Sequence, residues 1–387
     1  MSERFNFDRV IDRRGGAFAD SVKWNRYVGS DTLPLWVADM DFAAPPAVVD
    51  ALHGRVEHGV FGYADAWPGL TEAVRQHLAD SYGWQIEPDW LVWLPGLVTG
   101  LNVACRAVDG DVLTTTPVYP PFMSAPRLSG RGLTTVDLVQ VAGRWRWDWP
   151  ALTAAVTPQT RLLLLCHPHN PVGRAWQADE LAEIADFCTR HDLIVCSDEI
   201  HCDLMLEERR HVPLAMGGED IARRSITLMA PSKTFNVPGL GCAFAIIPDP
   251  VLRRTFTRAM AGIVPHVNLL GLIACEAALR DGGAWQQALL AVLRRNRDLV
   301  QATVDATPGV SMTPVEATYL AWIDVRGLGL QNPHRHFEAH GLGLSDGADF
   351  GAPGWLRLNF GCPLPTLQEA LRRFSAAVEA AESAPNR

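Results

Sequence analysis

The feature that most constrains the fold is a set of five short apolar runs in the middle of the chain. The runs cover residues 111–116, 161–166, 192–197, 225–230 and 242–247. Each is about as long as a single strand and is nearly continuous, a pattern typical of parallel strands whose two faces are both covered. We therefore expect a buried, mostly parallel sheet.

Helical patterns separate these runs. In residues 178–191, Leu181, Ile184 and Cys188 form one apolar stripe, and acidic residues stand near the start. Alternation of strands and helices is typical of the α/β class with a doubly wound sheet. We expect such a domain over residues 46–275.

The C-terminal part has a different pattern, in which long helical segments flank two strand-like segments. These are residues 284–306 and 366–382 for the helices, and 318–325 and 355–360 for the strands. A smaller α+β domain follows from this order. We expect it to consist of residues 276–387 together with an N-terminal arm, residues 1–45.

Composition and charge exclude several classes of protein. The 34 basic and 43 acidic residues leave a formal charge of −9, which argues against nucleic acid or an anionic membrane as the main partner. We see neither a signal peptide nor a run of about 18 apolar residues, and expect no membrane association. Eight cysteines without a CxxC pair suit a reduced, cytoplasmic setting, and the histidine spacing favours no metal site.

Polar side chains follow four of the expected strands. Tyr119, Asn170, Asp198 and Lys233 each come a few residues after a strand ends. Ligands of open α/β sheets bind beyond the carboxyl ends of the strands, so these side chains should converge at one edge. An amine, a carboxylate, an aromatic ring and an amide match the needs of a pyridine aldehyde cofactor.

Longer motifs extend this set along the whole chain. They are LPLWVADMDF (33–42), HGVFGY (58–63), PVYPPF (117–122), HPHNPVGR (167–174), SDEIHCDL (197–204), APSKTFN (230–236) and RLNFGCP (357–363). By these motifs the chain resembles the fold-type-I enzymes that depend on pyridoxal 5′-phosphate (PLP), in the aminotransferase class I/II superfamily. More narrowly, it resembles the MalY/PatB-type cystathionine β-lyases, or C–S lyases. The gaps of 28 residues from Asn170 to Asp198 and 35 to Lys233 are typical of the superfamily.

The resemblance implies the PLP-dependent transferase fold and a role for each cofactor residue. Lys233 would form the Schiff base with the cofactor and later shuttle protons, although a lysine after a strand is more often solvated. Asp198 would bind the pyridinium nitrogen, and Tyr119 would stack on the ring. Asn170 and His201 would contact the 3′ oxygen; His201 could instead be a structural histidine.

The resemblance also places the cofactor phosphate. It would lie near Ser232 and at the start of a helix after Gly96, where the backbone N–H groups of Leu97 and Val98 point at it. Val98 stands where a hydroxyl residue is common. Tyr63 would reach the phosphate from the neighbouring subunit, which implies a homodimer with the active site at the interface; packing beside Phe61 is the simpler alternative.

Two residues would contact the substrate. Arg357 would hold the α-carboxylate, a task suited to guanidinium, although it could be an exposed arginine on one face of its strand. Trp36 would form a wall of the pocket. His167 stands where the subfamily often has asparagine, and Ala317 where glycine is more usual, which leaves the exact substrate open.

The implied activity is β-elimination on a sulfur amino acid. L-Cystathionine or a related S-substituted cysteine would give a thiol (homocysteine), pyruvate and ammonia. An aminotransferase uses the same residues and is the first alternative. A regulatory binding role is the second, although we expect no DNA-binding helix-turn-helix extension.

Overall fold

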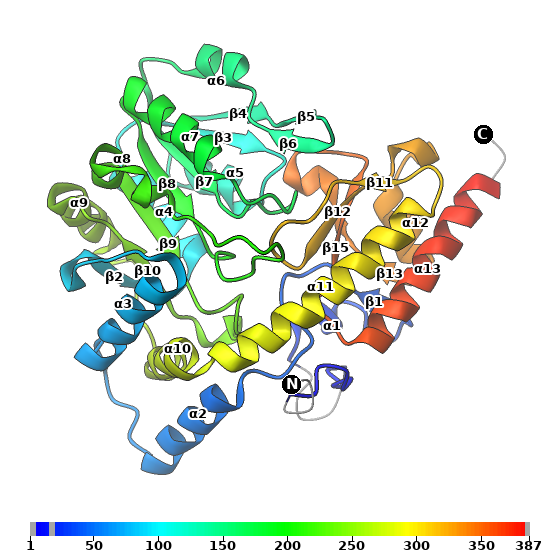
Figure 1. Ribbon diagram of the computed structural model, residues 1–387, viewed down its shortest axis with the longest axis horizontal. Coiled ribbons are helices and arrows are strands. Elements are labelled where there is room, and N and C mark those ends of the chain that lie inside the picture. Colours follow the sequence, from blue (N-terminus) through cyan, green and yellow to red (C-terminus); the bar gives the residue numbers. More distant parts are fainter. Residues whose placement is uncertain (1–4, 15–19, 384–387) are drawn as a thin grey trace.

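The computed structural model describes residues 5–14 and 20–383, and its centre is a seven-stranded sheet (Figure 1). The strand order is β2-β10-β9-β8-β7-β3-β4. The strands are β2 (Leu91–Leu94), β3 (Asp111–Thr116), β4 (Leu133–Asp137), β7 (Thr160–Cys166), β8 (Ile194–Asp198), β9 (Ser225–Met229) and β10 (Ala243–Ile246). This confirms the expected α/β class.

Both faces of the sheet are buried, which explains the continuous apolar runs. In β7, Leu162 and Leu164 pack in one core cluster, whereas Leu163 and Leu165 pack in another. The first cluster includes residues of α4 (Leu97–Ala107), α5 (Pro121–Leu128) and α9 (Pro250–Met260). The second includes α6 (Trp149–Ala155) and α7 (Ala178–Arg190), so helices cover each face.

One of the five predicted strands, β10, is not parallel as expected. β10 is antiparallel to both of its neighbours, β9 and β2, whereas β4, β3, β7, β8 and β9 are mutually parallel. Ala243 and Ala245 face one core cluster and Phe244 and Ile246 face another. Burial on both faces produces the apolar run, and that burial does not depend on strand direction.

Three helices pack together beside the β2 edge. They are α2 (Pro46–His58), α3 (Pro68–Tyr82) and α10 (Leu269–Asp281). Leu70, Val74 and Leu78 of α3 share a core cluster with Leu272 and Cys275 of α10. Shorter elements complete this part of the chain: α8 (Glu219–Arg223) and the pair β5 (Val139–Val141) and β6 (Arg144–Arg146).

The C-terminal part forms its own antiparallel sheet, in the order β11-β12-β15-β14. Its strands are β11 (Ser311–Met312), β12 (Leu320–Asp324), β14 (Ser345–Asp346) and β15 (Trp355–Asn359), and its helices are α11 (Gly283–Asp305), α12 (Pro333–Ala339) and α13 (Leu364–Ser383). In the N-terminal segment, which also holds α1 (Val22–Asn25), β1 (Leu33–Pro34) pairs with β13 (Leu342–Gly343). The division into two domains remains a proposal, and its boundary at residue 275 lies inside α10.

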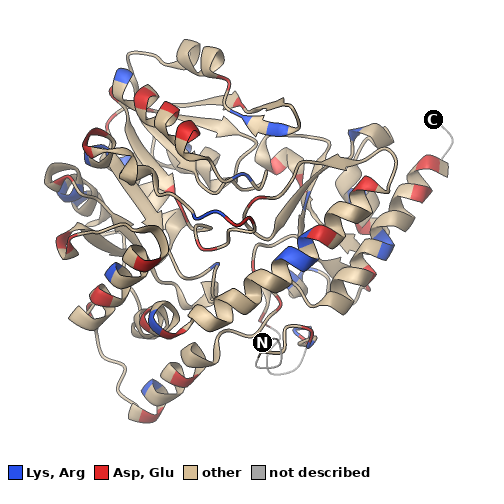
Figure 2. Cartoon of the chain, viewed as in Figure 1, with Lys and Arg blue, Asp and Glu red and all other residues tan. Residues whose placement is uncertain are grey.

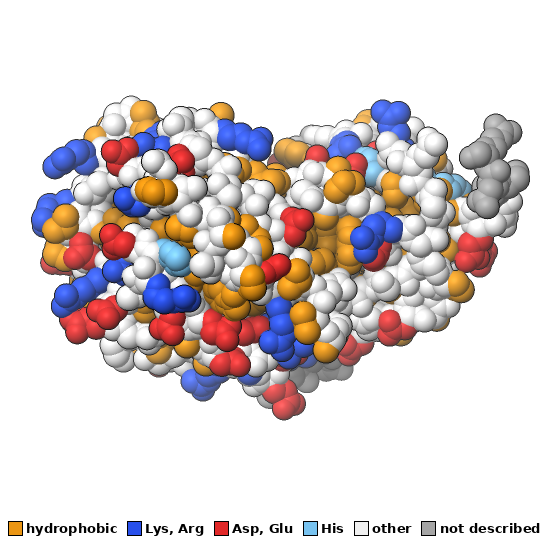
Figure 3. Space-filling view, turned by 90° about the horizontal axis from the view of Figure 1, so that it is seen from above, with side chains coloured by type: hydrophobic (Ala, Val, Ile, Leu, Met, Phe, Trp, Pro, Cys, Tyr) orange, Lys and Arg blue, Asp and Glu red, His pale blue; other side chains and the backbone are white. Residues whose placement is uncertain are grey.

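Charged side chains lie mostly on the outer helices and loops, while the central strands are largely uncharged (Figure 2). Seen from above, the surface is notched between the two parts of the molecule, with hydrophobic atoms gathered near the notch (Figure 3). Among the described residues, no helix is both long and apolar enough to cross a bilayer.

Candidate active site

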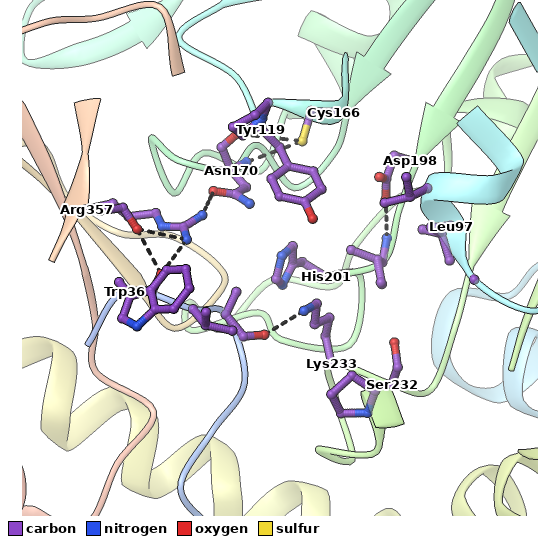
Figure 4. Close-up of a pocket in the computed structure, with 18 of the residues that line it drawn as sticks. Trp36, Leu97, Tyr119, Cys166, Asn170, Asp198, His201, Ser232, Lys233 and Arg357 are labelled. Atoms are coloured by element: carbon purple, nitrogen blue, oxygen red, sulfur yellow. Dashed lines mark hydrogen bonds between the residues drawn. The ribbon is translucent and has the colours of Figure 1, made fainter. Parts of the chain in front are cut away.

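A cavity of about 600 Å³ lies between the carboxyl ends of the central strands and the C-terminal sheet. Ten of the eleven residues singled out from the sequence line it, and Figure 4 shows nine of them by name around one space. They are Trp36, Leu97, Val98, Tyr119, Asn170, Asp198, His201, Ser232, Lys233 and Arg357. The residue that the structure does not bring to the cavity is Tyr63.

Asp198 is the last residue of β8, and its side chain is buried at the cavity wall. One carboxylate oxygen accepts the backbone N–H of Ile200 at 3.1 Å. Burial raises the pKa of Asp198 to about 7. A buried carboxylate with so few donors is suited to receive a cation, such as a protonated ring nitrogen.

Lys233 lies in the turn after β9 and reaches across the cavity to the N-terminal segment. Its ammonium donates to the carbonyl of Ala38 at 2.5 Å, as the dashed line in Figure 4 shows. Burial lowers the pKa of Lys233 to about 8. About one-tenth of this lysine is therefore free amine, the form that attacks an aldehyde, near neutral pH.

Arg357 on β15 joins the C-terminal sheet to the central one. Its guanidinium donates to the Asn170 amide oxygen at 2.9 Å, the Trp36 carbonyl at 2.7 Å and the Ser345 hydroxyl at 3.2 Å. The ring of Phe350 lies 4.7 Å away. Burial lowers the pKa of Arg357 to about 10, so the group stays cationic, and among the described residues its Nε has no hydrogen-bond partner.

His201 and Tyr119 form the walls beside Lys233. Burial, followed by the charges of Lys233 and Arg357, lowers the pKa of His201 to about 3, so this imidazole is neutral. Its Nδ1 has no partner within the described part of the chain. Burial also raises the pKa of Tyr119, so its hydroxyl keeps its proton and can act as a donor.

The far end of the cavity is suited to an anion. The first turn of α4 begins after Gly96, and Leu97, Val98 and Thr99 line the cavity there. Backbone N–H groups in the first turn of a helix have no acceptor within the helix and bind phosphate groups readily. Ser232 lies on the same cavity, and Thr99 supplies a hydroxyl one residue after Val98.

Tyr63 lies on the loop between α2 and α3, and its side chain is fully exposed. Val60 and Phe61 beside it are more than half exposed as well. The segment therefore does not pack on its own chain in the way that the simpler alternative supposed.

A second layer of buried polar groups supports the strand ends. Glu199 accepts hydrogen bonds from Ser197 at 2.8 Å and from the backbone of Leu214 at 3.1 Å, and pairs with His211 at 2.6 Å. The His167 ring packs on His211, with 4.3 Å between ring centroids. Neither His167 nor Ala317 lines the cavity.

Sequence reasoning missed four contributors to this site: the Ala38 carbonyl, Tyr319, whose hydroxyl donates to that carbonyl at 2.8 Å, Thr99 and Ser345. A backbone carbonyl carries no residue-type signal. Ser345 lies on a two-residue strand, too short to show a pattern. Tyr319 stands in the apolar segment before β12, where an aromatic residue is expected in a core.

The residues present fit PLP. The amine, the buried carboxylate and the helix N-terminus match its aldehyde, ring nitrogen and phosphate. Arg357 remains cationic beside the space that a substrate carboxylate needs. The fit rests on the donor and acceptor set of the cavity.

Comparison with known proteins agrees with this reading. Residues 30–374 match the model of the aminotransferase class I and II family, and the chain belongs to this family. Cystathionine beta-lyase PatB of Bacillus subtilis is 37% identical, over 96% of this chain and 100% of that protein.

Solved structures give the same answer for the fold. The crystal structure of OvoB has a TM-score of 0.94 and 47% identity, covering 97% of this chain and 99% of that one. The PLP-bound C-S lyase from Staphylococcus hominis has a TM-score of 0.89 and 28% identity, covering 97% and 98%. The expected PLP-dependent transferase fold is confirmed.

Proposed function

We propose that this protein is a PLP-dependent C–S β-lyase that cleaves L-cystathionine or a related S-substituted cysteine. With L-cystathionine and water the products are homocysteine, pyruvate and ammonia. The observation that carries the proposal is the convergence of Lys233, Asp198 and Arg357 on one cavity. The near full-length similarity to PatB, a cystathionine beta-lyase, narrows the reaction to carbon–sulfur cleavage.

The chain binds PLP, which supplies an electron sink for charge that develops at the substrate α-carbon. Lys233 would hold the aldehyde end and Asp198 the ring nitrogen. Asn170 and His201 would contact the ring oxygen, and Tyr119 would stack on the ring. Because His201 is neutral, it can offer a hydrogen bond there without adding a second positive charge beside Lys233.

The substrate carboxylate binds Arg357. This guanidinium is held in place by Asn170, the Trp36 carbonyl and Ser345, so little conformational freedom is lost when it pairs with the carboxylate. Trp36 and Phe350 line the cavity beside it, and Arg357 itself is only 5% exposed. A charge-assisted pair with so buried a group is stronger than one on the surface.

Lys233 performs the proton transfer. Its amine removes the α-proton, and a pKa of about 8 leaves it partly unprotonated at neutral pH while keeping it a useful base. The proton it carries is then available at the neighbouring β-position, where the thiol leaves. Tyr119, whose hydroxyl stays protonated, is the second donor on this side of the cavity.

Incubation with L-cystathionine as the single substrate separates a lyase from an aminotransferase. A lyase releases pyruvate and thiol continuously, in equal amounts, without a keto acid. An aminotransferase stops after one turnover until a keto acid is added. Protein that holds PLP but turns over no member of a panel of sulfur amino acids would instead support a regulatory binding role.

We also propose a cytoplasmic homodimer. The exposed Val60, Phe61 and Tyr63 form an apolar segment of the kind that subunit interfaces cover. Tyr63 would then reach the phosphate end of the partner's cavity. The eight cysteines, all unpaired, are compatible with a reducing compartment. Sedimentation of the holoenzyme tests the dimer, and an active monomer would refute the role of Tyr63.

A further inference from the structure

One backbone carbonyl at the site accepts two hydrogen bonds from different parts of the chain. The carbonyl of Ala38 receives the Lys233 ammonium at 2.5 Å and the Tyr319 hydroxyl at 2.8 Å. A single atom, the carbonyl oxygen of Ala38, therefore separates the Tyr319 hydroxyl from the reactive amine, although Tyr319 does not line the cavity. No role for it follows from the motifs of the chain.

The Tyr319 side chain is held rigidly as a donor. Only 1% of the residue is exposed, and its ring meets the His201 ring edge-on, with 5.9 Å between centroids. Burial raises the pKa of Tyr319 well above its usual range, so the hydroxyl keeps its proton. It can then donate to Ala38 throughout the pH range of catalysis.

The backbone before Tyr319 adopts an unusual conformation. Thr318 has φ of 77°, which a β-branched residue rarely adopts. Its N–H bonds to the carbonyl of Leu204 at 3.0 Å, and its hydroxyl accepts the N–H of Leu320 at 3.1 Å. Strained residues of this kind persist only where the surroundings impose them, and they concentrate at functional sites.

The surroundings here are an ion cluster around the buried carboxylate of Glu316. Glu316 pairs with Arg174 at 2.5 Å, with Arg209 at 2.7 Å and with Arg144. The carbonyl of Gly173 accepts the N–H groups of both Glu316 and Ala317. The motif Asn170-Pro171-x-Gly173-Arg174, which follows β7, thus holds in place the segment that leads to Tyr319.

We propose that Tyr319 is a positioning residue for Lys233. By donating to Ala38 it keeps that carbonyl facing the amine and occupies part of its acceptor capacity, so the carbonyl holds the lysine ammonium less tightly. The lysine then stays close to the site yet gives up a proton more easily. The consequence for catalysis rests on the proposed function of Lys233 as the base; the contact with Ala38 does not.

The alternative is that the hydroxyl only fills a hydrogen bond in the core. Tyr319→Phe separates the two roles, because it removes the hydroxyl and leaves the ring packing. Tyr27→Phe is the matched control, since the Tyr27 hydroxyl bonds to Glu338 at 2.9 Å and its residue does not line the cavity.

The composition allows a direct measurement on the full-length chain before PLP is added. Lys23 and Lys233 are the only lysines, so lysine labelled with 13C at Cε gives two resonances in an NMR titration. In Tyr319→Phe the whole Ala38 acceptor is left to the ammonium, and we expect the pKa of Lys233 to rise by about 0.5 to 1 unit. The Lys23 resonance and Tyr27→Phe should show no change.

The other charged groups that face Lys233 are the same in all these proteins. They are Asp39, Arg357 and Asp198, with neutral His201 beside them.

A second variant guards against misfolding: 3,5-difluorotyrosine at position 319 keeps the ring and hydroxyl but donates more strongly. It should lower the pKa of Lys233. An unchanged pKa in both variants would overturn the proposal.

Turnover supplies the second readout. In the Tyr319→Phe holoenzyme the acidic limb of the kcat profile should move to higher pH by the same 0.5 to 1 unit as in the titration. KM should stay as in the wild type. A shifted titration with a lyase-inactive wild type would refute the proposed function alone, whereas an active enzyme with an unshifted titration would refute the role of Tyr319 alone.

Discussion

Lys233→Ala tests the assignment of the site most sharply, because the chain has so few lysines. The only other one, Lys23, is buried in an ion pair with Asp41 at 2.7 Å and does not line the cavity. PLP added to the protein therefore has one accessible lysine amine. In the Lys233→Ala variant PLP should have no accessible lysine amine to react with.

The lowered pKa of Lys233 sets the size of the effect. A group of pKa about 8 is roughly one-quarter free amine at about pH 7.5, whereas at the ordinary value of 10.5 it would be roughly 0.1% free. The reactive form is therefore about 200-fold more abundant than on an ordinary lysine. The rate at which the protein captures PLP should rise with pH and level off above about 8.

The assay is reduction of the PLP-loaded protein with borohydride, followed by digestion and mass spectrometry. We expect one pyridoxyl group per chain, on Lys233, and none on Lys233→Ala. Turnover of this variant should fall by several orders of magnitude, since a positioned general base alone contributes about 10²–10⁴-fold. The matched control, Lys23→Arg, should be labelled as the wild type is.

Three results would refute the reasoning. A pyridoxyl group on Lys23 would place the cofactor elsewhere. Full steady-state activity of Lys233→Ala would remove the lysine from the mechanism. A capture rate that keeps rising to about pH 10.5 would show that burial does not lower the pKa of Lys233.

Three further predictions concern two residues of the cavity, Arg357 and Asp198, and the ion cluster of Glu316. Arg357→Lys should raise KM about 10–100-fold, because an ammonium cannot make the bidentate pair, while PLP affinity stays unchanged; exposed Arg335→Lys is the control in steady-state kinetics. Asp198→Asn keeps the acceptor for Ile200 but loses the anion, so PLP should bind about 10–100-fold more weakly in a fluorescence titration, and unchanged affinity would contradict the role of Asp198. Glu316→Gln should destabilise the fold by about 1–3 kcal/mol in urea, because it removes the buried carboxylate that pairs with Arg174, Arg209 and Arg144, whereas Arg174 keeps Glu180 and Arg209 keeps Glu207 as partners. Burial acts to raise the pKa of Glu316, but pairing with Arg174 and Arg144 outweighs it and lowers this pKa in the folded state. The stabilisation is therefore complete above the unfolded value of 4.5 and is lost as pH falls through the folded value; a gap between variant and wild type that persists in acid would contradict it.

Much of the central sheet could be predicted from the sequence. Leu162 to Leu165 alternate between two covered faces, so every position must be apolar, and the run is visible without a partner strand. Burial on both faces gives the same apolar pattern in a parallel and in an antiparallel strand, which is why β10 was predicted to be parallel. Short elements such as β13 and β14 depend on pairing with distant segments and left no pattern.

The residues of the site likewise divide into those that the sequence predicted and contacts that it could not predict. Asn170, Asp198 and Lys233 follow strands that any doubly wound sheet brings to one edge, so their convergence follows from chain order. The contact of Tyr319 with Ala38 joins residues 281 positions apart, and that of Arg357 with Asn170 spans 187 positions. The packing of the C-terminal part against the N-terminal segment decides the first contact, and its packing against the end of the central sheet decides the second.

The sequence by itself thus determined the fold class, because this depends on local periodicity, and it determined which side chains follow the strand ends. The cofactor followed from the motifs by which the chain resembles its family. The tertiary structure decided the state of each group. Burial sets the pKa of Lys233 near 8 and of Asp198 near 7, and it keeps His201 neutral. Desolvation and a carbonyl shared with Tyr319 are properties of the assembled chain, since they arise from atoms that meet only when distant segments pack together.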